Sequence, residues 1–258
     1  MSDKIQLALD GAVATVTLNR PDKLNAIDPE MLAGLETALA QVEDDRAARV
    51  VLLMGAGDRA FCVGADINAW AALEPLDMWR RWIRDGHRVF DRLARLRQPV
   101  IAVLNGYTFG GGLELALAAD LRLAAEGVEL AMPEVTIGTV PGWGGTQRLP
   151  ALIGPARAKQ MILTGSRVDA HTAERWGLVN DVVPREALMD AAYALAQEIA
   201  QNAPLSVQMA KQLIDGATGS GASVTLEALA GGLAASTDDG REGIAAFRER
   251  RPAQFSGR

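Results

Sequence analysis

The stretch 108-TFGGGLELAL-117 places three consecutive glycines directly before an acidic residue in an otherwise apolar run. It follows 99-PVIAVLNG-106, an apolar segment that is typical of a buried strand. The helix expected from about Gly111 to Ala119 is apolar on almost every face and is therefore expected to be buried. The sequence thus predicts a strand, a glycine turn and a buried helix that carries Glu114.

The glycine run has two interpretations. A tight turn with a positive φ requires glycine at one position. Glycines at the start of a helix also let backbone N–H groups approach a ligand closely, and the first N–H groups of a helix lack partners within it. Because one glycine is enough for a turn, the run favours a site that stabilises developing negative charge on an oxygen atom.

Glu114 is unusual because a lone buried carboxyl group is costly, so it is normally paired or has a raised pKa. The nearest basic residue downstream is Arg122, and a distant arginine brought close by the fold is the alternative partner. Without a partner, Glu114 is a candidate general acid or base. A second acid, Glu134, lies in 131-AMPEVTIGTVPGWGG-145; taken alone, such an acid is more often an exposed loop charge.

Hydrophobic patterns elsewhere in the chain alternate between strand and helix. Two period-2 runs meet at Asp10-Gly11, which is a strong hairpin signal. Asp28 followed by Pro29 indicates the start of an amphipathic helix. The other expected elements are strands at 49-RVVLLMGAG-57, 121-LRLAA-125 and 128-VELAM-132, a helix from about 76 to 96, and helices from about 187 onward, interrupted by the loop 216-GATGSGAS-223. Buried strands separated by a helix predict a parallel β-α-β arrangement.

Composition excludes several classes of protein. The chain has 258 residues, 49% of them hydrophobic, and a formal net charge of −6, which is unlike the basic excess of a nucleic-acid binder. We find neither a basic stripe nor an apolar run long enough to span a membrane. The segment 1-MSDKIQLALDG-11 does not resemble a signal peptide, and one cysteine allows no internal disulfide. We therefore expect a soluble cytoplasmic protein without nucleic-acid or membrane partners.

Other motifs are weak candidates for chemistry. The segment 55-GAGDRA-60 matches a dinucleotide-binding pattern, but no helical pattern follows it at once, and 141-PGWGGTQR-148 lacks the lysine of a phosphate-binding loop. Cys62 is expected to serve packing rather than nucleophilic attack. His87 and His171 are far apart without ligand-spaced partners, so no metal site is expected.

Three segments, taken together and in order, resemble the enoyl-CoA hydratase, or crotonase, family. They are 59-RAFCVGADI-67, 106-GYTFGGGLELALAADLRLA-124 and 132-MPEVTIGTVPGWGGTQRL-149, and the likeness extends to 241-REGIAAFRERRPAQF-255. The resemblance implies an α/β fold, a crotonase-like spiral of ββα units with a C-terminal all-helical region. It further implies a CoA-ester-binding core at residues 1–195, a helical oligomerisation region at 196–258, and assembly as a homotrimer or homohexamer, a dimer of trimers.

The resemblance also implies roles for single residues. The backbone N–H groups of Ala65 and Gly111 would hold the thioester carbonyl of a coenzyme A ester. Glu114 would activate water, Glu134 would exchange a proton with C2, and the backbone of Gly142 would help to hold the water. Because the chain keeps both glutamates, it is expected to be an enoyl-CoA hydratase (a hydro-lyase). An enoyl-CoA isomerase or a specialised hydroxyacyl-CoA dehydratase is the alternative, and an RNA-binding protein is an alternative of another class.

Coenzyme A enters as part of the substrate, and no permanently bound cofactor and no metal are implied. The residues that the resemblance assigns to binding of the CoA ester are Lys23, Leu24, Ala26, Ala65, Asp66, Ile67, Asn68, Gly111 and Trp143, with Asn25 in the same loop. Two positions depart from the family pattern. Asn68 replaces a frequent lysine, and Trp143 replaces a smaller residue, where it either reshapes the acyl pocket or packs away from it. Phe247 is a further candidate for the pocket, through a neighbouring subunit.

Overall fold

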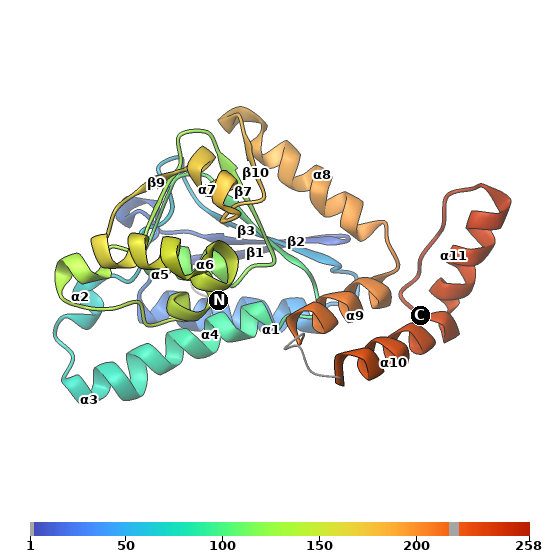
Figure 1. Cartoon of the computed structure of the whole chain (residues 1–258), viewed down its shortest axis with the longest axis horizontal. Helices are drawn as coiled ribbons and strands as arrows, with labels where there is room; N and C mark the ends of the chain where they lie inside the picture. Colours follow the sequence, from blue (N-terminus) through green and yellow to red (C-terminus); the bar gives the residue numbers. More distant parts are fainter. Residues whose placement is uncertain (1–2, 217–221) are drawn as a thin grey trace.

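The computed structural model describes residues 3–216 and 222–258 of the chain, and its strands form two sheets (Figure 1). The larger sheet has the order β1 (Ile5–Asp10), β2 (Val13–Leu18), β3 (Val50–Gly55), β5 (Val100–Leu104), β7 (Leu121–Ala125) and β10 (Asp181–Val183). The smaller sheet has the order β4 (Ala60–Cys62), β6 (Tyr107–Phe109), β8 (Glu129–Ala131) and β9 (Val168–Asp169). The pairs β1–β2 and β8–β9 are antiparallel, and the other pairs are parallel.

The N-terminal hairpin lies where the sequence predicts it. Asp10 pairs with Val13, so Gly11 and Ala12 form a two-residue loop. Gly11 has a φ of 56°, which suits glycine at the first central position of such a turn. The predicted parallel pairing of the two buried strands is also confirmed, because β3 pairs directly with β5.

The chain repeats one pattern three times: a strand of the larger sheet, a strand of the smaller sheet, and then a helical segment. The first repeat is β3 and β4 followed by α2 (Ile67–Trp70), α3 (Pro75–Asp77), η2 (Met78–Ile83) and α4 (Arg84–Ala94). The second is β5, β6 and α5 (Gly111–Leu117), and the third is β7 and β8 followed by η3 (Glu134–Ile137) and α6 (Gly145–Thr164). Because β4, β6 and β8 are parallel neighbours, their carboxyl ends meet at one edge, where open α/β folds commonly bind ligands.

The long helix predicted from about 76 to 96 is present, but its middle is wound differently. Residues Met78–Ile83 form a π-helical segment between α3 and α4. A π-helical turn is rare and occurs often at functional sites. Periodicity alone did not distinguish it, because the apolar residues continue through the segment.

Helices complete the core around the larger sheet. The helix α1 (Pro29–Asp44) begins as predicted, and the Asp28 carboxylate accepts a hydrogen bond from the Met31 N–H at 2.8 Å. The helix α8 (Leu188–Ala200) packs on β3, β5 and β7 through buried alanines such as Ala192 and Ala196. Figure 1 shows the sheet between α8 on one side and α1 with α4 on the other.

The C-terminal part is helical, as predicted. After α8 come α9 (Pro204–Asp215), α10 (Ala222–Ser236) and α11 (Asp238–Glu249), and α10 and α11 stand beside the sheets rather than on them (Figure 1). Most of the predicted loop 216–223 lies outside the described residues. Residue 195 falls within α8, and the division into two regions at that point stays a prediction. The remaining short elements are η1 (Pro21–Lys23), α7 (Ala170–Trp176) and η4 (Arg185–Ala187).

Candidate active site

The three glycines that open α5 each meet a different neighbour. Gly110 has a φ of 53°, and a Cβ on it would lie 3.1 Å from Glu134 Oε1. A Cβ on Gly111 would lie 2.7 Å from Cζ3 of Trp143, and one on Gly112 would lie 2.1 Å from the Cys62 carbonyl oxygen. The run therefore does more than turn the chain, because it lets the start of α5 pack closely against three other segments.

Two backbone N–H groups lie side by side at this point. In the bridge between Ile27 and Ala65, the neighbours of Ala65 make the hydrogen bonds (Ile27 N to Gly64 O and Asp66 N to Ile27 O, both 2.8 Å). The Ala65 N–H therefore faces away from Ile27. A Cβ on Gly111 would lie 3.4 Å from the Ala65 nitrogen. Within the described residues, neither the Ala65 nor the Gly111 N–H donates a hydrogen bond.

Glu114 is fixed by the main chain. Its side chain is almost completely buried, and its Oε1 accepts hydrogen bonds from the Trp143 N–H at 2.7 Å and the Gly145 N–H at 2.8 Å. Burial raises the pKa of Glu114, while the N–H groups of Gly145, Trp143 and Gly142 act in the opposite direction. The partners of Glu114 are therefore backbone N–H groups rather than a distant arginine, and the charge of Arg148 lowers its pKa by a smaller amount. The sequence left pairing and a raised pKa as alternatives, and the structure gives Glu114 both.

Glu134 is held very differently. It begins η3 directly after β8, and both carboxylate oxygens are buried without a hydrogen-bond partner among the described residues. Burial, with a smaller contribution from the nearby charge of Glu114, raises the pKa of Glu134 to about 7. Its interpretation as an exposed loop charge is therefore wrong. The turn of η3 brings the carboxyl group inward, which the local sequence does not indicate.

A cavity of about 230 Å³ joins these groups. Much of its wall is apolar, with Trp70, Met78, Trp82, Ile83 and Val140 among the lining residues. From the predicted site, the lining includes Ala65, Ile67, Gly111, Glu114, Glu134, Gly142 and Trp143. Two carboxyl groups and two free N–H groups thus share one apolar cavity, an arrangement suited to proton transfer next to an oxygen that gains negative charge.

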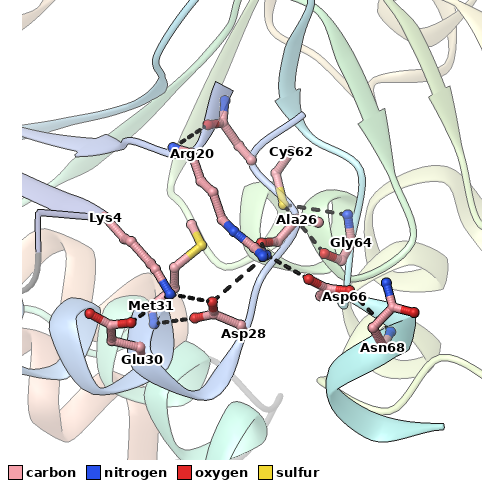
Figure 2. Close-up of polar contacts among 11 residues, drawn as sticks. Lys4, Arg20, Ala26, Asp28, Glu30, Met31, Cys62, Gly64, Asp66 and Asn68 are labelled. Carbon is pink, nitrogen blue, oxygen red and sulfur yellow. Dashed lines mark hydrogen bonds and ion pairs between the residues drawn. The ribbon is translucent and has the colours of Figure 1, made fainter. Parts of the chain in front are cut away.

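The other residues predicted to bind the substrate lie outside this lining, in two adjoining segments, and Figure 2 labels Ala26, Asp66 and Asn68 among them. They are Lys23, Leu24, Ala26, Asp66 and Asn68, of which Lys23 and Asn68 are exposed. The Asp66 carboxylate caps α2 by accepting the Asn68 N–H at 3.0 Å.

Arg20 links these two segments by hydrogen bonds. The sequence did not indicate this role. Its guanidinium donates to the Ala26 carbonyl at 3.0 Å and to Asp66 Oδ2 at 2.7 Å, as Figure 2 shows. The hydrogen bond from Arg20 holds the pKa of Asp66 below its usual range. Arg20 and Asp66 are 46 positions apart, so no local pattern could have indicated their contact.

Asn25 is a second residue whose role the sequence did not show. Leu24 and Asn25 both adopt positive φ angles, 52° and 57°, a conformation that is rare for leucine. The buried Asn25 amide donates to the carbonyls of Ala56 and Ala60 and accepts the Arg20 N–H at 2.9 Å. These bonds fix the loop in a strained shape, as is common around binding sites.

Cysteine and histidine take no part in this cavity. Cys62 is fully buried, and burial raises the pKa of its thiol to about 12, which confirms the packing role. His87 lies near Asp91 on α4 and His171 near Glu174 on α7. The described part of the chain contains no cluster of three or more His, Cys, Asp or Glu side chains that would suit a metal ion.

One helical face carries a row of arginines, so the expected absence of a basic stripe is wrong for this face. Arg80, Arg84, Arg88 and Arg92 recur every four residues along η2 and α4, a spacing that is visible in the sequence. Arg88 and Arg92 pair with Glu36 of α1 at 2.8 and 2.6 Å. The acidic partner neutralises part of this row.

Comparison with known proteins agrees with this geometry. The family model described as enoyl-CoA hydratase/isomerase matches residues 9–258. A short-chain-enoyl-CoA hydratase of Clostridium acetobutylicum is 39% identical over 96% of this chain and 96% of its own length. An (E)-benzylidenesuccinyl-CoA hydratase of Thauera aromatica is 41% identical, with 98% and 99% covered. The solved structure of an enoyl-CoA hydratase from Bacillus anthracis has a TM-score of 0.95 at 37% identity and covers 99% of this chain and 100% of that chain. The predicted α/β fold, a crotonase-like spiral with a C-terminal helical region, is confirmed.

Proposed function

The chain belongs to the enoyl-CoA hydratase/isomerase family, and from this premise we propose that it is an enoyl-CoA hydratase. It adds water reversibly to the 2,3 double bond of an enoyl-CoA thioester. The observation that carries the proposal is the pair of glutamates in one apolar cavity, Glu114 bonded by backbone amides and Glu134 without a partner.

The N–H groups of Ala65 and Gly111 bind the thioester carbonyl. Addition of water at C3 moves negative charge onto that oxygen, and donors that are already in place stabilise it. Loss of one such donor typically costs roughly 3 to 4 kcal/mol of transition-state stabilisation. The Gly111 N–H is the first of α5, so the helix dipole also favours negative charge at this point.

The two carboxyl groups divide the proton transfers. Glu134, whose pKa is raised to about 7, is protonated in a large fraction of molecules at neutral pH and delivers this proton to C2. The N–H donors to Glu114 favour its carboxylate form, which orients and deprotonates the water that attacks C3. The backbone of Gly142, in the cavity wall, helps to hold that water.

Coenzyme A is bound as part of the substrate, without a resident cofactor. The loop that contains Lys23, Leu24 and Ala26 and the segment from Ala65 to Asn68 take the CoA moiety. Support for this comes from the bonds of Arg20 to both segments, which hold them as one surface. Asn68 contributes no charge to a CoA phosphate, so the exposed Lys23 is the cationic residue of this set.

The C-terminal helices assemble the protein as a homotrimer or as a homohexamer of two trimers. The support is a set of large apolar side chains exposed on α9, α10 and α11: Ile214, Leu226, Leu229, Leu233, Ile244 and Phe247. Exposed apolar patches of this kind commonly mark protein interfaces. Phe247, which is 86% exposed and absent from the cavity of its own chain, then contacts a neighbouring subunit or its substrate.

The place of action is the cytoplasm, in the metabolism of fatty acyl-CoA esters, without nucleic-acid or membrane partners. The net charge of −6 supports this. Among the described residues, the helices are too short or too polar to cross a lipid bilayer.

The test is turnover of crotonyl-CoA and of a 3-enoyl-CoA by the purified protein and by Glu114→Gln and Glu134→Gln. We expect wild-type protein to form 3-hydroxybutyryl-CoA, and each substitution to lower kcat roughly 10²- to 10⁴-fold, the range for one general acid or base. Binding of a saturated acyl-CoA should persist in both variants. Full hydration by either variant, or conversion of the 3-enoyl ester alone, would contradict the proposal.

A further inference from the structure

The indole of Trp143 lies in a recess formed by two glycines from different helices. A Cβ on Gly86 of α4 would lie 2.2 Å from Nε1 of Trp143 and 2.3 Å from Cε2. A Cβ on Gly111 of α5 would lie 2.7 and 2.8 Å from Cζ3 and Cε3, at the other end of the same ring system. Each glycine therefore leaves room that the indole fills.

Aromatic neighbours fix the ring in this recess. The Phe90 ring meets the indole edge-on with centroids 5.1 Å apart, and the Trp82 ring lies 5.2 Å away. The indole N–H points to the Trp82 carbonyl at 3.4 Å, and the Trp143 side chain is only 2% exposed. Aromatic pairs at these separations are favourable beyond the area they bury. The indole is thus a rigid wall and not a side chain that moves aside easily.

The same residue borders the reacting groups. The Trp143 N–H donates a hydrogen bond to Glu114, and Trp143 is one of the residues that line the cavity. In the proposed reaction, the carbonyl lies at Ala65 and Gly111, and C2 and C3 face the two glutamates. Acyl carbons beyond C3 then pass Glu114 toward the wall that the indole forms.

We propose that Trp143, seated in the recess of Gly86, closes the acyl end of the cavity and restricts the enzyme to enoyl-CoA esters with short acyl chains. This inference rests on the proposed function and names its substrate class. Trp143 acts here as a specificity-determining residue, and Gly86 is its structural complement. The indole of Trp143 closes the cavity, and the absence of a side chain at Gly86 makes room for it, although the two residues lie in separate segments of the chain.

The experiment compares crotonyl-, hexenoyl-, octenoyl- and decenoyl-CoA as substrates for wild-type protein and Trp143→Ala. We expect wild-type kcat/KM to fall steeply with length, because misfit of a single methylene costs roughly 10- to 200-fold. Trp143→Ala should raise the ratio of octenoyl- to crotonyl-CoA turnover by at least about 10-fold. Trp176→Ala is the matched control, since Trp176 ends α7, lies outside the cavity lining and stacks under Arg157. It should leave the ratio unchanged.

The recess is tested separately by Gly86→Ala, alone and together with Trp143→Ala. In wild-type protein the new methyl group collides with the indole, so crotonyl-CoA turnover and Tm should both fall. In the Trp143→Ala background the collision is gone, and Ala is the better helix former, so Tm should rise. A Tm change of the same sign in both backgrounds would overturn the pairing of these two residues.

Two further outcomes decide the specificity itself. Wild-type turnover of decenoyl-CoA as fast as crotonyl-CoA, or an equal loss for all lengths in folded Trp143→Ala, would overturn the proposal. Trp143→Phe, which keeps an aromatic ring, gives an intermediate length limit and serves if the alanine variant does not fold. If wild-type protein hydrates none of the esters, titration with butyryl- to decanoyl-CoA reports the length limit by binding alone. A limit that Trp143→Ala shifts then supports this inference although the proposed function has failed.

Discussion

The turns after β6 and β8 occupy equivalent places in successive ββα units, yet they hold their carboxyl groups in opposite ways. After β6, a glycine run begins a regular helix, and Glu114 lies one turn along it with two backbone N–H donors on one oxygen. After β8, a short 3₁₀ turn carries Glu134 with both oxygens buried and unbonded. The repeated fold supplies the place, and the local backbone decides how each acid is held.

This difference in hydrogen bonding favours ionisation of Glu114 more than that of Glu134, and the charge of Arg148 adds only a smaller contribution at Glu114. Backbone donors to a carboxyl oxygen favour its ionised form, whereas burial without donors favours the protonated form. Both groups are buried, so both pKa values are raised, and the charge of one raises the pKa of the other. A pair that shares a cavity but differs in hydrogen bonding can thus present one base and one acid at the same pH.

The sharpest way to break the comparison is to remove both carboxylates at once. If Glu114 and Glu134 act in one transition state, the double variant Glu114→Gln/Glu134→Gln should lose roughly 10²- to 10⁴-fold in kcat, about as much as the worse single variant. The measurement is kcat for crotonyl-CoA hydration in all four proteins. Losses that multiply would show that the two groups act in separate steps.

The unpartnered state of Glu134 should also appear in stability. Its pKa is about 7 in the folded protein and 4.5 ordinarily, so its protonated form is favoured by folding. The stability from this group is therefore complete below about pH 4.5 and is lost as the pH rises through 7. The loss amounts to about 3 kcal/mol at most, at 1.36 kcal/mol for each pKa unit.

Glu134→Gln removes this pH dependence. We therefore expect the free energy of unfolding of the variant to increase relative to that of wild-type protein between about pH 5 and about pH 8. Urea unfolding at both pH values gives the difference directly. Glu198→Gln, on the exposed side of α8, is the control and should run parallel to wild-type protein. Equal stability curves for wild-type protein and Glu134→Gln would mean that the carboxyl group is solvated.

Sequence patterns predicted those features of the structure that depend on residues close together in the chain. Strand, glycine run and apolar helix around Glu114 follow from local periodicity and turn chemistry, and the three motifs carried the family. The sequence did not predict which backbone groups bond Glu114, because Trp143 and Gly145 reach it only through the start of α6. The inward turn of Glu134 and the bridging by Arg20 likewise depend on contacts between distant segments.

The two turns also differ in packing, and glycine substitutions measure this. Gly112 after β6 has the Cys62 carbonyl where a Cβ would be, whereas Gly138 after β8 has nothing within 4 Å. We expect Gly112→Ala to cost about 3 kcal/mol of unfolding free energy, from overpacking. Gly138→Ala should cost only about 1 kcal/mol, from its positive φ of 76°. Equal costs, measured by urea unfolding, would show that the first turn relaxes around a methyl group.

The smallest expected effect concerns the loops outside both turns. A substitution there should weaken substrate binding and leave the chemical step nearly unchanged. Arg20→Ala removes the hydrogen bonds to Ala26 and Asp66 that hold the proposed CoA surface. Without them, the segment of Ala26 and the segment of Asp66 can move independently of each other. Hydrogen bonds of a charged donor are worth about 1.5 to 3 kcal/mol, but water replaces part of this at a half-buried site. We therefore expect KM for crotonyl-CoA to rise about 10-fold, at 1.4 kcal/mol for each factor of ten, with kcat nearly unchanged. Arg46→Ala, on an exposed loop, is the control. A fall in kcat with constant KM would instead place Arg20 in support of the carboxyl pair, since only the reacting groups would then have lost their alignment.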